Sequence, residues 1–492
     1  MRDEIEKLIE KAIKELGFKV PKVLVEEPRE KTHGDYATNV AMMIAGKAKK
    51  DSMQVAEMIE TKVKSNIIEK VEIVKPGFIN FFVSKEYLQK QAEEILKKKE
   101  KFGNLKIGKK QKINVEFISA NPTGPLTLGN GRGGFCGDVL SNVLEKAGYN
   151  VFREFYINDQ GKQVEDLKKG LYRGEKRTAL QIQKENQKFI TKKLKIKFDN
   201  WFSEKSLYKN KEVDKVLAYL RKKKLTYKEE GALWFKSTKF GDDKDRVLIK
   251  KSGDYTYLAS DIAYLKNKFG RKFDKLILFW GADHHGYIGR MKAAVETLGY
   301  KKEQIDFIIF QMVQLIEKGK QVRMSKRAGT YVALEELIDE VGLDVARFFF
   351  LIRGYGTHLN FDLSLAKEKS EKNPVYYVQY AHARICSILR KAKIKPDIRS
   401  LNELKEKSEL DLIKQLIRFE EIIEDISKDY QVQRVPQYAI DLAESFHKFY
   451  KDCRVLTEDK ELSQARMLLI LATQTVLKNT LDLMGISSPE KM

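Results

Sequence analysis

The stretch from Ile113 to Gly134, INVEFISANPTGPLTLGNGRGG, places the strictest limits on what this chain can fold into. It opens with an apolar run, Ile113 to Ile118, of the kind that fills the middle of a parallel sheet. Two prolines stiffen the following loop, Asn121 to Pro125, because they fix φ and remove hydrogen-bond donors. We therefore expect a buried strand, a rigid loop, and a helix that begins at about Leu126 and ends near Gly148.

Five glycines crowd the first turns of this expected helix: Gly129, Gly131, Gly133, Gly134 and Gly137. Each costs about 1 kcal/mol in a helix, so we expect a ligand against the bare backbone, and a nucleotide suits the positive N-terminus of a helix. The spacing from Gly129 to Gly134 also matches the dinucleotide-binding fingerprint, which makes a dehydrogenase an alternative. In that fingerprint the first glycine follows the strand directly, whereas a proline-braced loop intervenes here.

The composition favours a phosphate-rich partner and a reducing compartment. The 492 residues include 93 lysines and arginines against 70 aspartates and glutamates, a formal net charge of +23. This charge suits nucleic acids, although a lysine-rich solvated surface would produce it as well. The cysteines, Cys136, Cys386 and Cys453, form neither a CxxC pair nor a disulfide framework. We therefore expect a cytoplasmic protein without structural zinc, and no apolar stretch is long enough to span a membrane.

The chain is too long for a single core, and its patterns change twice. Residues 1–104 combine amphipathic helices with a strand at Gly77 to Val83, which predicts a small α+β domain. Residues 105–360 alternate strands and helices, which predicts an α/β fold with a doubly wound parallel sheet and a charged helical insertion at about 163–230. Val247 to Ile249 is expected to return the chain to this sheet. Residues 361–492 carry helical apolar stripes and predict an α-helical bundle.

Three motifs accompany the second half of the expected sheet. Tyr257 and Asp261 are four residues apart at a helix start, so they share one face. Gly281 to His285 follows an expected strand at Leu276 to Trp280, and Arg323 to Arg327, RMSKR, comes after the next strand. The two neighbouring histidines of the first of these, at positions 284 and 285, point to opposite sides of a strand end. They cannot both ligate one metal ion, so no protein metal site is predicted.

Four segments together resemble one family, the arginyl-tRNA synthetases of class I. Glu116 to Gly134 is similar to the family's first signature, and Arg323 to Arg327 is similar to its second, usually written KMSKS. Thr32 to Asn39, THGDYATN, resembles a stretch of the N-terminal domain that contacts the tRNA elbow. Asn373 to Arg384 resembles part of the anticodon-binding domain. The resemblance covers essentially the whole chain.

The resemblance implies an ATP-dependent ligase. Arginine and ATP would give arginyl-AMP and pyrophosphate, and the arginyl group would then pass to the terminal ribose of its tRNA. The implied partners are arginine, ATP and arginine tRNA, with no membrane, and we expect a monomer. Mg²⁺ would be carried by ATP rather than by a protein cage. The family also implies that activation requires tRNA.

The same resemblance assigns the residues that act on ATP. Thr127 and Asn130 stand where the first signature normally has histidines, and they are predicted to be catalytic together with Arg323 and Lys326. Hydrogen bonds from the neutral Thr127 and Asn130 side chains would replace those of the two histidines, and the guanidinium of Arg323 would replace the first lysine of the second signature. The predicted ATP-binding residues are Gly129, Gly131, Gly281, Asp283, His284, Met324 and Ser325.

Selection of arginine should depend on carboxylates, because a guanidinium is best held by planar two-point acceptance. The residues that match the family's arginine site are Glu116, Ser119, Asn121, Tyr257 and Asp261. A first-turn dipole partner or a salt bridge is the structural alternative for Asp261. The missing histidines also leave open a catalytically impaired, tRNA-binding relative, against which the retained Glu116, Asp261 and Lys326 argue.

Overall fold

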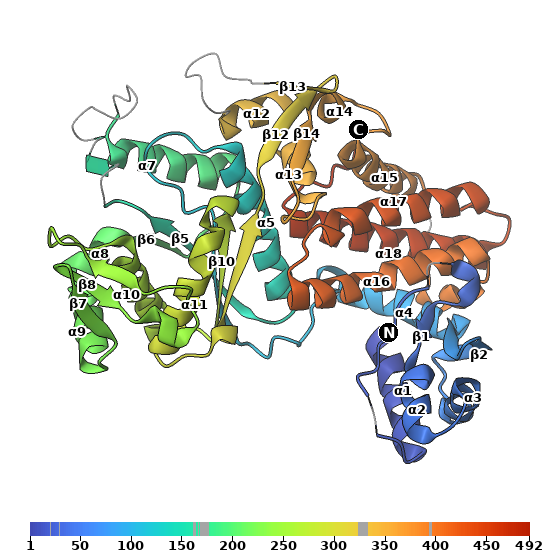
Figure 1. The fold of residues 1–492 in the computed structure, drawn as a ribbon. Helices are drawn as coiled ribbons and strands as arrows, with labels where there is room; N and C mark the ends of the chain where they lie inside the picture. Colours follow the sequence, from blue (N-terminus) through green and yellow to red (C-terminus); the bar gives the residue numbers. More distant parts are fainter. Residues whose placement is uncertain are drawn as a thin grey trace.

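The computed structural model describes residues 1–19, 21–28, 30–160, 164–165, 167, 177–322, 333–392 and 396–492. Three folded parts follow one another along the chain, and Figure 1 shows them with the N-terminal part in blue and the C-terminal helices in red. They match the three predicted domains in order and in class, while the limits at 104 and 360 stay predictions. Among the described residues, none of the helices has the length and apolar composition needed to cross a membrane.

The N-terminal part packs helices against a small antiparallel sheet with strand order β1-β3-β2. Its strands are β1 (Tyr36–Thr38), β2 (Ile68–Val74) and β3 (Phe78–Val83). Buried apolar side chains on these helices and on β3 belong to a hydrophobic core that continues into the central part and the C-terminal helices. Its helices are α1 (Arg2–Glu15), η1 (Lys31–His33), α2 (Val40–Ala48), α3 (Ser52–Lys62), α4 (Lys85–Lys98) and η2 (Lys99–Lys101).

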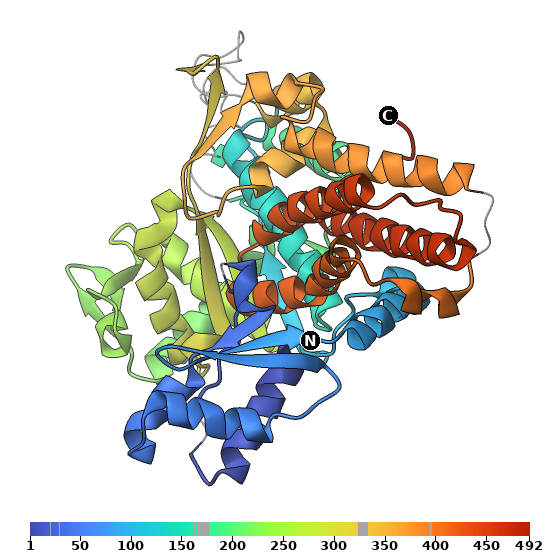
Figure 2. The ribbon, with the colours of Figure 1, turned by 90° about the vertical axis from the view of Figure 1, so that its right-hand side faces the viewer.

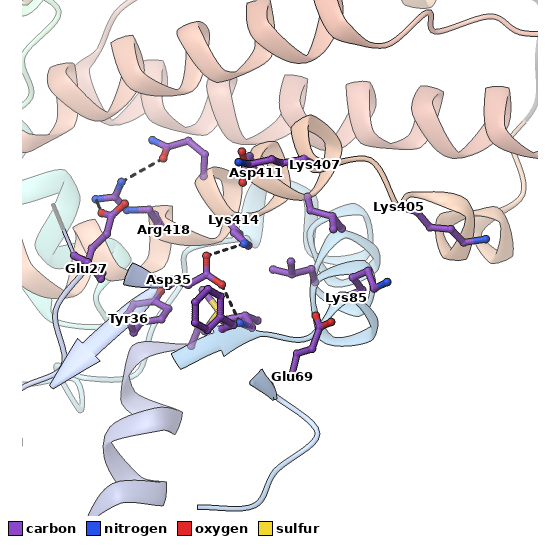
Figure 3. A pocket seen from close by; sticks show the side chains of 18 residues that line it. Glu27, Asp35, Tyr36, Glu69, Lys85, Lys405, Lys407, Asp411, Lys414 and Arg418 are labelled. Atoms are coloured by element: carbon purple, nitrogen blue, oxygen red, sulfur yellow. Dashed lines mark hydrogen bonds and ion pairs between the residues drawn. The ribbon is translucent and has the colours of Figure 1, made fainter. Parts of the chain in front are cut away.

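The motif Thr32 to Asn39 holds the N-terminal part to the C-terminal helices. Asp35 accepts a hydrogen bond from the Val83 backbone nitrogen at 2.8 Å and forms an ion pair with Lys414 at 2.7 Å. The Tyr36 hydroxyl donates to Glu421 Oε1 at 2.8 Å in a buried contact. Figure 3 shows Asp35, Tyr36 and Lys414 beside a groove of about 460 Å³ between the two parts. Two side chains of the motif therefore serve a contact within the chain, and its expected contact with the tRNA elbow stays a prediction.

The central part is a parallel sheet of five strands in the order β11-β10-β4-β5-β6. The strands are β4 (Lys112–Glu116), β5 (Asn150–Ile157), β6 (Asn200–Ser203), β10 (Lys275–Gly281) and β11 (Ile305–Phe310). Side chains on β10 alternate between two cores, with Leu276 and Leu278 on one side and Ile277 and Phe279 on the other. The predicted doubly wound parallel sheet is confirmed.

Helices cover both faces of this sheet, as the alternation on β10 requires. The long helix α5 (Leu128–Lys146) packs on one face, and α10 (Tyr257–Gly270) and α11 (Ile288–Thr297) pack on the other. From β4 the chain crosses to β5 on one side and later returns to β10 on the other. The strand order therefore reverses beside β4, where ligands bind in folds of this kind.

The predicted helical insertion at 163–230 was wrong in part, because two strands lie inside it. Strand β6 joins the edge of the main sheet, and β7 (Thr226–Glu229) begins a separate three-stranded antiparallel sheet with β8 (Ala232–Phe235) and β9 (Arg246–Ile249). Val247 to Ile249 therefore pairs with β8 and does not return the chain to the main sheet. The helices of this region are α7 (Ala179–Lys188), η3 (Phe189–Lys193), α8 (Glu204–Lys209), α9 (Glu212–Lys222) and η4 (Ser237–Phe240).

Short elements link the sheet to the C-terminal helices. Strands β12 (Val313–Glu317) and β14 (Leu359–Asp362) pair in parallel, and β13 (Lys320–Gln321) extends β12 as a hairpin. The helices here are η5 (Ala282–Tyr287), η6 (Lys302–Gln304), α12 (Leu334–Val341), α13 (Leu343–Leu351) and α14 (Leu363–Lys367).

The C-terminal part is the predicted helical bundle, and in Figure 2 the N-terminal part lies below it. Arg347 joins this bundle to the central part. Its guanidinium is 1% exposed and donates to Asp138 Oδ2 at 2.7 Å, to the Met484 carbonyl at 2.9 Å and to the Leu194 carbonyl at 2.8 Å. The bundle consists of α15 (Pro374–Lys391), η7 (Ile398–Glu403), α16 (Lys407–Asp429), α17 (Arg434–Asp452) and α18 (Lys460–Met484).

Candidate active site

The predicted site residues that the structure describes gather at the carboxyl ends of β4 and β10 and at the starts of α5 and α10. Glu116 is the last residue of β4, Gly281 is the last residue of β10, and Tyr257 begins α10. These ends meet where the strand order reverses, which is the usual ligand position in an open α/β sheet. Segments that lie far apart in the sequence are thereby brought to one edge.

The chain turns sharply after β4. Ile118 and Ser119 both have positive φ values, 67° and 40°, so the strand ends at Glu116 instead of continuing to Ile118 as expected. The Ser119 hydroxyl donates to Glu116 Oε1 at 3.1 Å and accepts from the Tyr156 backbone nitrogen at 3.1 Å. Left-handed conformations cost energy for residues other than glycine. These hydrogen bonds hold the turn in place and tie the ends of β4 and β5 together.

Thr127 and Asn130 cap the start of α5. Asn130 Oδ1 accepts from the Thr127 backbone nitrogen at 2.9 Å and from the Thr127 hydroxyl at 2.9 Å, while the Asn130 nitrogen donates back to Thr127 Oγ1 at 3.4 Å. This reciprocal arrangement is a capping box, which satisfies two of the unpaired N–H groups of the first turn. The two residues that stand at the histidine positions therefore build the helix N-terminus itself.

The glycine-rich start of α5 packs mainly against protein. A Cβ at Gly131 would lie 2.6 Å from Leu334, and one at Gly137 would lie 2.4 Å from Phe117. A Cβ at Gly133 would lie 2.9 Å from Phe310, and one at Gly134 would lie 3.0 Å from Ile118. The expectation that a nucleotide explains all five glycines was therefore wrong. Among the described residues, an added Cβ at Gly129 would meet only Thr127 Oγ1, at 3.6 Å, so this glycine keeps an accessible backbone.

Glu116 is buried and has partners for both carboxylate oxygens. Oε1 accepts from Ser119, and Oε2 lies 2.6 Å from the ammonium of Lys268, a residue of α10 that is 0% exposed. Glu154, opposite Glu116 on β5, joins the same network through Lys268 at 3.5 Å. Lys268 carries no sequence signal of its own, and the structure adds it to the site.

Asp261 and Glu204 form the anionic part of the site. Burial, with Glu204 and Glu116 nearby, raises the pKa of Asp261 to about 7, although Arg290 opposes the shift. Burial raises the pKa of Glu204 to about 7 as well, with Asp159 adding to the shift and the Ser260 and Tyr156 hydroxyls opposing it. Within the described parts of the chain, neither carboxylate forms an ion pair within 4 Å. Because burial raises both pKa values and no ion pair offsets it, these two carboxylates are suited to binding a cation.

The sequence-based analysis missed Glu204. It follows directly after β6, so recognition of Asn200–Ser203 as a strand of the main sheet would have placed Glu204 at the same edge as Glu116. The charged character of the surrounding segment hid this signal. Tyr257 lies one turn before Asp261 on α10, with 62% of its surface exposed, and Asn121 is exposed on the loop after β4.

The predicted ribose-binding residues lie at the end of β10. Gly281 ends the strand, and a Cβ there would lie 2.6 Å from Asp283 Oδ1, so a larger residue would push this exposed side chain aside. His284 packs near Trp280 and Tyr287, with ring centroids 5.8 Å apart in each pair. Both histidines at 284 and 285 belong to the 3₁₀ helix η5 and not to a strand end, so the expected alternation does not apply to them.

The second signature lies outside the described residues, and with it Arg323, Met324, Ser325 and Lys326. The chain after this segment returns to the site. Ala333 forms an antiparallel bridge with Thr127, and the Leu334 nitrogen donates to the Leu126 carbonyl at 2.8 Å. The described residues contain no group of three or more His, Cys, Asp or Glu side chains placed to hold a metal ion.

Comparison with family models matches nearly the whole chain. Residues 3–83 match the arginyl tRNA synthetase N terminal domain. Residues 91–206 and 171–349 match the catalytic domain of class I (R) tRNA synthetases. Residues 378–492 match the DALR anticodon binding domain.

Full-length relatives agree with the family models. The chain is 43% identical to arginine–tRNA ligase 1 of Halalkalibacterium halodurans and 45% identical to the arginine–tRNA ligase of Bacillus velezensis, over 100% of this chain and 99% of each relative. Among solved structures, the arginyl-tRNA synthetase of Thermus thermophilus shares the fold with a TM-score of 0.81, at 22% identity and over 100% of both chains. The chain belongs to the arginyl-tRNA synthetases, a family of class I aminoacyl-tRNA synthetases.

Proposed function

We propose that the protein is an arginine–tRNA ligase that forms arginyl-AMP from arginine and ATP and then transfers arginine to the 3′-terminal adenosine of arginine tRNA. One observation carries this proposal: Asp261 has a raised pKa because it is buried near Glu204 and Glu116, and the loop after Glu116 leads into the capped N-terminus of α5. These carboxylates suit a cationic side chain, and the helix N-terminus suits phosphates. The reaction needs both groups side by side.

Arginine would bind with its guanidinium at the carboxylates. Asp261 and Glu204 supply the negative charge, and Tyr257, on the same helix face as Asp261, can offer its hydroxyl as a further hydrogen-bond partner. Glu116, Ser119 and Asn121 border the pocket from the β4 side, where the α-amino and carboxylate groups of arginine would lie. Because Asp261 and Glu204 both have a raised pKa, binding a guanidinium would favour their charged forms.

ATP would bind along the start of α5. The capping box engages Asn130 Oδ1, so the Asn130 side-chain amide hydrogens can be directed to phosphate oxygens. The N–H groups of Leu128 and Gly129 belong to the first turn, which offers no intrahelical acceptor. The ribose and base would be held by Gly281, Asp283 and His284. Gly131 lacks a side chain, and this allows Leu334 to pack closely against α5. Positioning and electrostatics then supply the catalysis.

Charge on the departing pyrophosphate would be met by the second signature. Lys326 is proposed to act on it, with Arg323 as a bidentate partner and Met324 and Ser325 on the ATP-binding segment. The Mg²⁺ ion would be bound by the ATP phosphates, whose oxygens suit its octahedral shell. When bound, it would neutralise phosphate charge during the displacement.

Transfer to tRNA would use the flanking domains, and activation of arginine would require tRNA. The net charge of +23 suits a polyanion. All three cysteines are free and buried, as in proteins of reducing compartments, so we keep the cytoplasm as the proposed location. A monomer stays a prediction from the sequence. A catalytically impaired relative is not favoured, because the relatives are named as ligases across their full length.

Aminoacylation of arginine tRNA tests the proposal. Purified protein with ATP, Mg²⁺ and labelled arginine should form acid-precipitable arginyl-tRNA that depends on all components. Citrulline, which keeps the shape of arginine but has no charge, should not be accepted, because the pocket is built for a cation. Binding of tRNA without any charging would instead support the impaired relative.

A further inference from the structure

A buried lysine lies beneath the proposed arginine pocket. The ammonium of Lys268 is 2.6 Å from Glu116 Oε2, 2.5 Å from Asn114 Oδ1 and 3.5 Å from Glu154 Oε1. It also lies 4.6 Å from the centroid of the Tyr264 ring. A fully buried ammonium is costly unless its hydrogens are met by acceptors. Here oxygens from β4 and β5 meet them, and the aromatic ring adds a cation–π contact.

Glu154 does not depend on Lys268 alone. Arg271 donates to both of its oxygens, at 2.5 and 2.8 Å, and Tyr264 and Asn200 each donate to it at 2.7 Å. Although burial opposes it, the charges of Lys268 and Arg271 lower the pKa of Glu154 to about 2. Glu116 has Lys268 as its one cationic partner within 4 Å in the described chain. Loss of Lys268 would therefore affect Glu116 far more than Glu154.

The two oxygens of Glu116 are held by different segments of the chain. Oε1 accepts from Ser119 in the loop after β4, and Oε2 accepts from Lys268 on α10. A carboxylate held at both oxygens has one orientation, and in that orientation Oε1 stays hydrogen-bonded to Ser119. Without the lower contact, the side chain could rotate away from Ser119.

We infer that Lys268 is a positioning residue for arginine selection, which acts by fixing Glu116 at the edge of the pocket. The inference rests on the proposed function. It also explains the charge distribution of the site. Lys268 and Arg271 offset Glu116 and Glu154, so the negative charge left for the substrate is confined to Asp261 and Glu204. The internal cation thereby restricts the guanidinium to one end of the pocket.

Lys268→Met tests the inference, because methionine fills a similar volume without a charge. We expect the arginine KM in aminoacylation to rise at least tenfold, with the ATP KM and the tRNA KM within twofold of wild type. Arg271→Met is the matched control: it removes a cation from the end of the same helix and from Glu154, and Arg271 makes no direct hydrogen bond or ion pair to Glu116 in the described chain. Its arginine KM should stay within threefold of wild type. An unchanged or lower arginine KM in folded Lys268→Met would overturn the inference.

A double variant separates positioning from a general structural role. If Lys268 acts through Glu116, then adding Lys268→Met to a Glu116→Gln background should change the arginine KM by less than twofold. Independent, multiplied effects would contradict the inference. Should Lys268→Met fail to fold, Asn114→Ala removes another anchor of the ammonium, and it should raise the arginine KM about threefold. A wild-type KM in that variant would also overturn the inference. Failure of the wild-type protein to charge tRNA would instead refute the proposed function.

Discussion

Asn130 Oδ1 lies 2.9 Å from both the backbone nitrogen and the hydroxyl oxygen of Thr127. The two residues that stand at the histidine positions of the first signature are therefore hydrogen-bonded to each other. Their contact makes the N-cap of α5, the helix whose N-terminus is proposed to face ATP. Histidines at both positions could not reproduce this cap, because the arrangement uses a hydroxyl and an amide oxygen. Thr127 and Asn130 therefore form one structural unit, the capping box at the start of α5.

Restoring the usual signature should change the pH dependence of activation. Neither threonine nor asparagine titrates, whereas a histidine changes charge near pH 6.5. In single-turnover adenylate formation, the variant with Thr127→His and Asn130→His should therefore be faster below about pH 6.5 than above it, relative to wild type. Its stability should fall by about 1 kcal/mol through loss of the cap. Identical pH profiles for the two proteins would mean that these side chains do not face the reacting phosphates.

Arginine binding should strengthen as the pH rises through 7. Asp261 and Glu204 both have a pKa of about 7, above the usual range for carboxyl groups, so each becomes charged between pH 6 and 8. The arginine KM should fall over this interval. Asp261→Asn should raise the KM at least tenfold at pH 8 and flatten its pH dependence, since a charged hydrogen bond contributes on the order of 1.5–3 kcal/mol. An unchanged arginine KM in this variant would remove Asp261 from the site.

The raised pKa values of Asp261 and Glu204 make the folded protein less stable as the pH rises. The folded protein binds protons more tightly than the unfolded chain at Asp261 and Glu204, so these two groups make unfolding easier as the pH rises from about 4 to about 7. Saturating arginine should offset this loss, because the ligand stabilises the charged carboxylates. Melting temperatures measured with and without arginine should diverge as the pH rises from 6 to 8. Equal ligand-induced shifts at both pH values would contradict this account.

Arg347→Met should weaken the attachment of the C-terminal helices to the central part. The change leaves Asp138 and two carbonyls in a buried site without their donor, which costs about 3 kcal/mol or more. Urea unfolding should show a lower midpoint, and proteolysis should separate the two parts sooner. Arg399→Ala, which removes an exposed ion pair with Asp397, is the control and should leave both measurements unchanged.

Lys326→Ala should slow the formation of arginyl-AMP while leaving the arginine KM nearly unchanged. Its ammonium is proposed to act on charge that develops only as pyrophosphate leaves. The variant should therefore have a lower kcat. Single-turnover measurement of adenylate formation checks this. A change confined to KM would assign Lys326 to substrate binding.

The fold was largely predictable because each signal was local. The proline-braced loop after Ile113 to Ile118, the helix that follows it and the helical stripes of the C-terminal part all depend on neighbouring residues. Strand β6 and the small sheet β7-β8-β9 were missed, because short strands in a charged segment resemble helix or loop until their partners are known.

The candidate site was predictable only in part. Glu116, Tyr257 and Asp261 follow from the family resemblance and lie together at the sheet edge. Glu204 and Lys268 could not be found in this way, because their roles arise from long-range packing. The glycines of α5 show the same limit, since the side chains that need their space come from Leu334, Phe310, Ile118 and Phe117.

ATP–pyrophosphate exchange with arginine tRNA present tests the central claim most directly, because it reports which amino acid the carboxylate pocket selects. We predict exchange with arginine, little with lysine, and none with citrulline. We also predict that arginine exchange disappears when tRNA is omitted and that Asp261→Asn needs at least tenfold more arginine for the same rate. Equal exchange with citrulline and arginine, or no exchange with arginine in the presence of tRNA, would contradict the account.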